Sequence, residues 1–167
     1  MSVTDTFAKD PKAALREQLK NETAVMLGVE GVTDFMKPMS AKPDVDADVV
    51  WFFTDRRSDT FGNLPGSPNA HICISDSQNK FWADIKGSIQ TTENCEAVAS
   101  NWSADIEAWY EKGREDPNMQ LMAFTPEVAE VSVATSNPIK FSWETVKAIL
   151  GDQDQPDISD TKKVTYV

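Results

Sequence analysis

The sequence predicts a single α+β domain, mainly β, in which an antiparallel β-barrel carries helices on its outside. A chain of 167 residues suits one domain with one core. About seven short runs have the composition of strands and are separated by turn residues. These runs follow one another instead of alternating with helices, and the chain has no GxGxxG or GxxxxGK[ST] loop. Both features disfavour a doubly wound nucleotide-binding fold.

Composition and charge limit the classes of partner. Hydrophobic residues make up 40% of the chain and charged residues 26%, which is ordinary for a folded domain. The formal net charge of −11 would repel nucleic-acid phosphates and anionic lipid. No apolar run is long enough to span a bilayer, and the N-terminal MSVTDTFAKDPK lacks the apolar segment of a signal peptide. We therefore expect a cytoplasmic protein with no nucleic-acid or membrane partner.

The first third of the chain predicts one helix and then a meander of strands. Pro11 at a first helical turn and the i, i+4 pair Leu15 and Leu19 predict an amphipathic helix over Asp10–Lys20. Three strand patterns follow, separated by Gly31 and by the turn-rich KPDVDAD. They are AVMLGV from Ala24, DFMKPMSA from Asp34 and VVWFFT from Val49.

The middle of the chain predicts two more strands. SDTFGNLPGSP is interpreted as a short helix ended by Pro65 and Gly66. Strand pattern resumes in HICIS and in FWADIKGSI, and in the second run apolar and polar residues alternate. One face of that strand is therefore expected in the core, and the other is expected to meet solvent or a ligand.

The last third predicts two helices and two strands. Apolar residues at helical spacing predict a helix over Asn101–Lys112; they are Trp102, Ile106, Trp109 and Tyr110. For the two tryptophans this periodicity favours packing in the core or in a dimer interface. QLMAF and EVAEVSV are predicted as two strands split at Thr125 and Pro126. Ser142 is expected to cap a final helix that ends before Gly151. Residues 1–150 would then form the domain, and residues 151–167 a polar, mobile tail.

The residues that most often carry catalysis or bind metals are sparse. Cys73 and Cys95 lack CxxC spacing and are expected to be buried free thiols. The single histidine, His71, lies in a predicted strand and is interpreted as a partly buried strand residue. The acidic run DVDAD over Asp44–Asp48 lacks the glycine and glutamate of a calcium loop, which favours a solvated turn. No metal site is expected.

Four stretches carry a resemblance to a known family. The clearest is WFFTDRRSDT, from Trp51 to Thr60, a strand that ends in aromatic residues and runs into a Thr-x-x-x-Ser turn. The other three, in matching order, are MKPMSA from Met36, AWYEKGREDPN from Ala108, and TPEVAEV from Thr125 with the later WETVKA helix. Together they resemble the pyridoxamine 5'-phosphate oxidase-like split barrels, and more closely their bacterial general stress protein 26-like branch. The similarity extends from Pro11 to Leu150.

This resemblance implies a Greek-key split β-barrel that forms a homodimer and holds one FMN in each of two grooves at the subunit interface. Carried over residue by residue, it implies three groups of FMN-binding residues and one groove-lining aromatic. They are Lys37, Met39 and Ser40 beside the ring, Phe53 and Thr54 at the strand end, Ser58 and Thr60 in the phosphate turn, and Trp82 in the groove. For Trp82 the alternative is a strand residue that packs under a helix.

The sequence departs from the family pattern at two cationic positions. Family members usually carry Arg where this chain has Lys37, and Lys where it has Thr60. A compact ammonium does not replace a bidentate guanidinium, and a threonine carries no charge. Arg56 and Arg57, in the same turn, could compensate as phosphate ligands, or they could be solvated loop charges. The partner of Lys37 could be a phosphate, a ring carbonyl or an internal carboxylate.

The leading hypothesis for function is an FMN-binding flavoprotein of the general stress protein type with an oxidoreductase role. No general acid or base stands out. Vitamin B6 oxidation is not expected, because the chain lacks the C-terminal basic residue and histidine of the oxidase proper. The alternative is a flavin-free split-barrel dimer that acts as a ligand-binding or interaction module. Deazaflavin or haem use is a third hypothesis.

Overall fold

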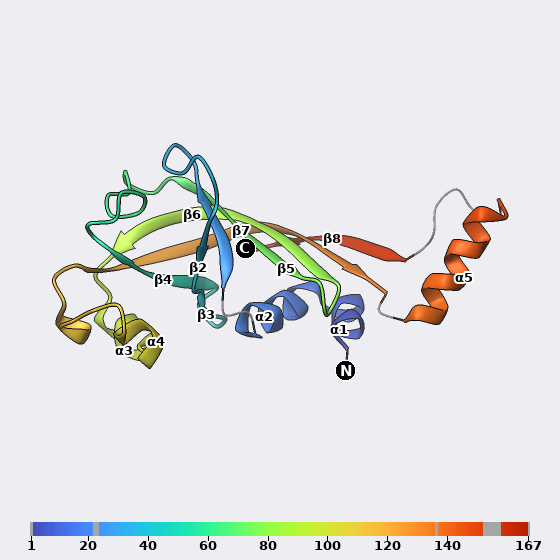
Figure 1. The fold of residues 1–167 in the computed structure, drawn as a ribbon, viewed down its shortest axis with the longest axis horizontal. Coiled ribbons are helices and arrows are strands. Elements are labelled where there is room, and N and C mark those ends of the chain that lie inside the picture. Colours follow the sequence, from blue (N-terminus) through green and yellow to red (C-terminus); the bar gives the residue numbers. More distant parts are fainter. Residues whose placement is uncertain (1, 22–23, 136, 152–157, 167) are drawn as a thin grey trace.

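The computed structural model describes residues 2–21, 24–135, 137–151 and 158–166. Figure 1 shows one long, strongly curved antiparallel sheet with helices around it. In these residues the strands are β1 Val25–Val29, β2 Lys37–Met39, β3 Lys42–Asp44, β4 Val49–Asp55, β5 Asn69–Asp76, β6 Phe81–Thr92, β7 Met119–Ala134 and β8 Ser159–Thr165. Their order is β2-β1-β5-β6-β7-β4-β3, and β8 also pairs with β7. The α+β class is confirmed.

The sheet curls because its two edge strands are close neighbours in sequence. β2 and β3 stand at opposite ends of the strand order, yet only Ser40 and Ala41 separate them. Such a connection spans on the order of 10 Å, so the two edges must approach each other. The sheet is therefore a half-barrel rather than a flat layer.

β7 is the longest strand and connects the two halves of the sheet. One side of β7 pairs with β6 along its length, while on the other side residues 119–124 pair with β4 and residues 128–134 with β8. The sequence predicted two strands split at Thr125 and Pro126, and this break is wrong. The register shifts between Lys86 and Gly87, opposite Pro126, so a β-bulge accommodates the proline. A Cβ on Gly87 would collide with the Thr125 carbonyl, which explains the glycine.

The core lies on the concave side of the sheet. Burial alternates along β4, β5 and β6, as the sequence pattern predicted, and Phe52 and Phe81 are fully buried. The predicted first helix is confirmed as α2, Pro11–Asn21, which buries Leu15 and Leu19. It is preceded by α1, Val3–Lys9, which the sequence analysis did not predict and whose capping box joins Ser2 and Asp5.

Two predicted helices differ in the structure. SDTFGNLPGSP forms successive turns rather than a helix. The predicted helix over Asn101–Lys112 is also wrong: α3 spans Cys95–Asn101, and α4 only Ala104–Glu107, followed by the short 3₁₀ helix η1 at Gly113–Glu115. After α4 the backbone bonds shorten to i, i+3, from Trp109 to Ile106 and from Tyr110 to Glu107. The chain therefore turns away from the helix axis.

The C-terminal region also differs from expectation. The last helix, α5, spans Pro138–Ile149, so it begins before Ser142. Asn137 takes the capping role, because its side-chain oxygen accepts from Lys140 N at 3.3 Å. The segment expected as a polar tail contains β8, which pairs with β7 and buries Val164. Residues 152–157 and 167 lie outside the described residues.

The two ends of the sheet carry different helices. In Figure 1, α3 and α4 lie at one end of the sheet, and α5 stands apart at the other end, beyond β8. Within the described residues, no helix has the length and apolar character needed to cross a membrane.

Candidate functional site

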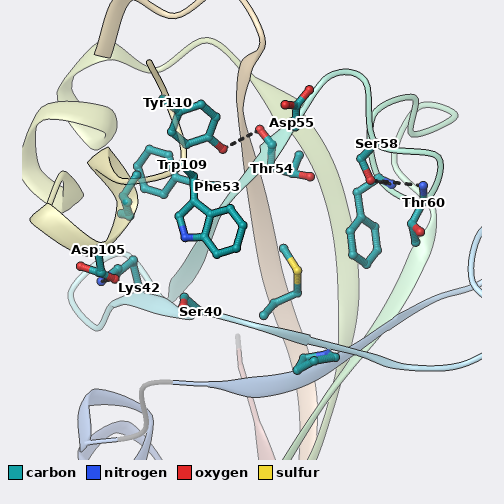
Figure 2. Close-up of a pocket in the computed structure, with 14 residues that line it drawn as sticks. Ser40, Lys42, Phe53, Thr54, Asp55, Ser58, Thr60, Asp105, Trp109 and Tyr110 are labelled. Atoms are coloured by element: carbon teal, nitrogen blue, oxygen red, sulfur yellow. Dashed lines mark hydrogen bonds and ion pairs between the residues drawn. The ribbon is translucent and has the colours of Figure 1, made fainter. Parts of the chain in front are cut away.

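A pocket of about 500 Å³ lies where β2, β3 and β4 meet the turn after β4 and the α4 region. Its volume falls in the ~300–1,000 Å³ range of small-molecule sites. Figure 2 shows the 14 residues that line it. They come from two distant parts of the sequence, residues 38–61 and residues 105–110.

Aromatic side chains form much of the pocket wall. Phe53 and Tyr110 line it, and Trp102 packs behind both of them. The Trp102 ring meets Phe53 edge-on, with centroids 5.9 Å apart, and its centroid is 6.0 Å from that of Tyr110. Trp109 stands at the rim with 83% of its surface exposed. Trp102 thus supports the pocket wall formed by Phe53 and Tyr110, whereas the Trp109 side chain is mostly exposed.

A buried hydrogen bond fastens the α4 region to the end of β4. The Tyr110 hydroxyl donates to the Thr54 carbonyl oxygen at 2.9 Å, a contact drawn as a dashed line in Figure 2. Burial raises the pKa of Tyr110 to about 12, and the charges of Asp55 and Asp116 add to the rise. The phenol is therefore neutral near pH 7 and remains a donor.

The turn after β4 is compact and presents two hydroxyl residues to the pocket. Ser58 Oγ accepts hydrogen bonds from the backbone N–H groups of Thr60 and Phe61, both at 3.2 Å. Gly62 closes the turn, and a Cβ there would collide with the carbonyl oxygens of Arg56 and Ser58. Because its acceptor sites are used, the Ser58 hydroxyl is left to donate its own hydrogen.

Each carboxylate at the pocket is paired with a cation. The Arg57 guanidinium binds Asp55 at 3.0 and 2.6 Å; this hydrogen bonding, together with that of the Arg57 backbone N–H, lowers the pKa of Asp55 to about 2. Lys42 Nζ lies 3.4 Å from Asp105 Oδ2. The pKa of Asp105 is lowered first by its hydrogen bond with Ser103 and also by Lys42. Both carboxylates are charged near neutral pH, and their charges are offset locally.

Six of the nine candidate binding residues, which are the eight implied by the resemblance and Arg57, line this pocket together. They are Met39, Ser40, Phe53, Thr54, Ser58 and Thr60. The other three lie outside its lining. Lys37 is exposed on β2, Arg57 points back to Asp55, and Trp82 is exposed on β6 between Ser75 and Ser132 of the neighbouring strands.

Six polar or aromatic residues that line the pocket were not among the candidates from the sequence: Lys42, Asp55, Phe61, Asp105, Trp109 and Tyr110. Lys42 lies in KPDVDAD, which was interpreted only as a turn but begins with the short strand β3. Tyr110 falls within the matched stretch AWYEKGREDPN, so the resemblance contained a signal for it. Trp109 was predicted to pack in the core or in a dimer interface; it is 83% exposed and lines the pocket, so packing in the core is wrong.

Other chemically interesting residues lie away from the pocket. The described residues contain no cluster of His, Cys, Asp or Glu suited to a metal ion. His71 is a half-buried strand residue, as expected, with Nδ1 3.3 Å from Asp84 Oδ1. Both cysteines are free, but the expected burial is wrong, since Cys95 is exposed and Cys73 half-buried. The DVDAD run forms a turn in which Asp44 accepts backbone N–H groups.

Comparisons with known proteins agree with one another. A family model described as "Pyridoxamine 5'-phosphate oxidase like" matches residues 10–157. The crystal structure of a general stress protein 26 from Jannaschia sp. CCS1 is similar, with 30% sequence identity, a TM-score of 0.77, and coverage of 95% of this chain and 99% of that chain. The general stress FMN/FAD binding protein from Xanthomonas citri is 27% identical, with a TM-score of 0.70 and coverage of 77% and 92%. A search of curated proteins found no match.

Proposed function

The chain belongs to the pyridoxamine 5'-phosphate oxidase-like family, and from this premise we propose that it is an FMN-binding flavoprotein of the general stress protein type with an oxidoreductase role. One observation supports this proposal: six of the residues that the resemblance implies line the same pocket. A similar protein from Xanthomonas citri is described as FMN/FAD binding. When bound, FMN would supply hydride transfer at its ring.

The pocket residues fit the two parts of FMN. A flat isoalloxazine ring needs apolar walls, which Met39, Phe53 and Trp109 offer. A phosphate needs hydrogen-bond donors, and the turn offers the hydroxyls of Ser58 and Thr60. Since Ser58 Oγ already accepts two backbone N–H groups, its hydrogen is available to a phosphate oxygen. Ring and phosphate would thus meet different ends of the same pocket.

The electrostatics favour loose rather than tight binding of a phosphate. Arg57 is bound to Asp55, and Lys42 is near Asp105, so neither cation is wholly available. Thr60 contributes no charge. A charge-assisted hydrogen bond contributes about 1.5–3 kcal/mol, so the absence of one lowers affinity by roughly one to two orders of magnitude.

The chain's own contribution would be orientation and shielding of the ring rather than proton transfer. Asp55 has a pKa of about 2 and Tyr110 one of about 12, so neither is poised to exchange a proton near pH 7. The Tyr110 hydroxyl is also committed to the Thr54 carbonyl. Phe53 and Trp109, which line the pocket, would help to exclude water from a bound ring.

Lys37 and Trp82 take part in this proposal only through a second subunit. Both are exposed and lie outside the lining of the pocket in their own chain. A homodimer with flavin at the subunit interface, as the resemblance implies, could bring them to the partner's pocket. Their role therefore depends on the dimer.

Flavin titration tests the proposal. Purified protein should quench the fluorescence of added FMN; colourless protein that leaves the fluorescence unchanged would refute flavin binding. Thr60→Lys should lower the Kd for FMN by about tenfold or more, because it restores a charge-assisted contact to the turn. Ser67→Lys is the matched control, since it adds the same charge at an exposed position outside the pocket lining. Equal Kd values for the two variants would count against the phosphate placement.

The second candidate is a flavin-free split-barrel dimer that binds another ligand or protein. The engagement of Arg57 by Asp55 and the neutral Thr60 favour it. A stable dimer that shows no response to FMN would select this candidate over the first.

A further inference from the structure

The ionisable groups that line the pocket carry a net negative charge. Among the lining residues are one cation, Lys42, and two carboxylates, Asp55 and Asp105. Tyr110 also lines the pocket and is neutral near pH 7, because its pKa is raised to about 12. At this pH the lining therefore has a formal charge of −1, in a chain whose net charge is −11.

Arg57, in the turn after β4, is engaged by carboxylates of the same chain. Its guanidinium nitrogen Nη2 lies 2.6 Å from Asp55 Oδ2. Hydrogen bonding with Asp55 raises the pKa of Arg57, and the charges of Asp116 and Glu111 act in the same direction. A bound phosphate would have to compete with these carboxylates for the guanidinium.

Two further cations near the pocket are also paired. Arg56 Nη2 lies 3.7 Å from Glu93 Oε1, and Lys42 Nζ lies 3.4 Å from Asp105 Oδ2. Both contacts are long, yet each carboxylate still offsets the field of its cation. In Figure 2, Lys42 and Asp105 lie at the side of the pocket away from Ser58 and Thr60. Neither pair therefore brings a net positive charge to the turn.

The turn itself offers alcohol groups in place of cations. Ser58 Oγ accepts the backbone N–H groups of Thr60 and Phe61, both at 3.2 Å, so its own hydrogen is left to donate. The Thr60 hydroxyl can donate or accept, and both residues line the pocket. Such a pair matches a third alcohol, because Ser58 can donate to its oxygen while Thr60 accepts its hydrogen.

FMN and riboflavin differ in the group that would reach this turn. FMN carries a phosphate with a charge of about −2 near pH 7, where riboflavin has a terminal hydroxyl. Burying a charge is unfavourable unless an opposite charge pairs with it, whereas an alcohol exchanges its hydrogen bonds with water at little cost. Both flavins share the ring, which would meet the same apolar walls, including Met39 and Phe53.

We propose that the pocket selects its flavin by charge and binds neutral riboflavin in preference to FMN, with the terminal hydroxyl of riboflavin hydrogen-bonded to Ser58 and Thr60. The inference rests on the proposed flavin binding and specifies the form of the flavin. Repulsion between the charge of the lining and a phosphate roughly 8 Å away corresponds to about a threefold difference in Kd at about 20 mM salt.

Quenching titrations with riboflavin and with FMN test this inference, because both flavins are fluorescent. In about 20 mM NaCl, the Kd for FMN should exceed that for riboflavin by about threefold or more. In about 0.5 M NaCl, the Kd for FMN should fall toward that for riboflavin, since screening removes the repulsion. A phosphate held by a cation would behave in the opposite way, with a Kd for FMN that rises with salt.

Two lysine variants locate the selecting position. Thr60→Lys should reverse the order of the two flavins, so that FMN binds more tightly than riboflavin, because the turn then holds a cation for the phosphate. Ser67→Lys is the matched control: it adds the same charge at an exposed position outside the pocket lining. This variant should keep the preference for riboflavin.

Three results would overturn the inference and leave flavin binding in place. They are a Kd for FMN below that for riboflavin in the wild-type chain, a Kd for FMN that rises with salt, and a folded Thr60→Lys variant that keeps the wild-type order. The first two need no substitution, so they stand even where a variant fails to fold. If the protein quenches neither flavin, the proposed function is refuted and this inference with it.

Discussion

The two ends of the sheet differ in how their helices are held. At the pocket end, the α4 region is fastened to β4 by the Tyr110–Thr54 hydrogen bond and by the packing of Trp102. At the other end, α5 and the residue after it leave five large apolar side chains exposed, which are Phe141, Trp143, Val146, Ile149 and Leu150. The same sheet therefore carries one region fastened by side-chain contacts and one helix whose apolar side chains stay exposed. Substitutions at the two ends should accordingly differ in their cost to stability.

The largest expected effect is on the core beneath the pocket. Phe52 is fully buried in β4, so Phe52→Ala should lower the free energy of unfolding by about 3–5 kcal/mol. Trp143→Ala, at the other end of the sheet, should instead cost about 0.5 kcal/mol or less, because the Trp143 side chain is 62% exposed. Urea unfolding of both variants measures the two losses, and a loss for Trp143→Ala as large as that for Phe52→Ala would contradict the comparison.

The next effect concerns the turn that shapes the pocket. A Cβ on Gly62 meets the carbonyl oxygens of Arg56 and Ser58, so Gly62→Ala should cost about 3 kcal/mol through backbone displacement. Gly151 is the matched glycine after α5: it has φ +80° but open space around its Cβ position. Gly151→Ala should cost about 1 kcal/mol. Thermal unfolding of both variants checks the order, and a larger loss for Gly151→Ala would reverse it.

A smaller effect is expected from the bond that closes the pocket end. Tyr110→Phe removes a buried donor from the Thr54 carbonyl oxygen, and we expect a loss of about 1–2 kcal/mol. Hydrogen exchange should also speed up in residues 104–112 and not in α5. Unchanged exchange in both regions would show that the bond does not hold the α4 region.

The smallest effect is a dependence on alkaline pH. Burial raises the pKa of Tyr110 to about 12, and likewise that of Tyr166, from an ordinary value of 10. The unfolded chain loses these protons first, so the stabilisation is complete below pH 10 and is lost as pH rises from 10 toward 12. Tyr110→Phe and Tyr166→Phe should each flatten this decline. Urea midpoints between pH 9 and 11.5 measure it, and a decline equally steep in both variants would exclude the tyrosines as its cause.

The sequence pattern correctly predicted the strands that have one buried face and one exposed face. Apolar and polar residues alternate along β6, and burial follows the same alternation. The pattern failed for β8, because only Val164 is buried in its sequence, SDTKKVT. Backbone pairing with β7 holds this strand in the sheet. It failed again over Asn101–Lys112, where a long-range bond from Tyr110 to Thr54 competes with helical periodicity.

The site was predictable only in part for a similar reason. The resemblance implied Ser58 and Thr60 through a short local stretch, and both line the pocket. Lys42 and Asp105 are 63 residues apart, so no local pattern could bring them together. Their proximity follows from the curl of the sheet, which the sequence predicts only as a class of fold.

The position of β7 has a consequence for synthesis on the ribosome. β7 pairs with β4, β6 and β8, yet it begins only at Met119. Until it emerges, β4 and one side of β6 lack their neighbour and present open strand edges, which are prone to intermolecular pairing. Sheet completion is therefore a late event in translation, and nascent chains that stall between β6 and β7 are the ones for which a chaperone matters most.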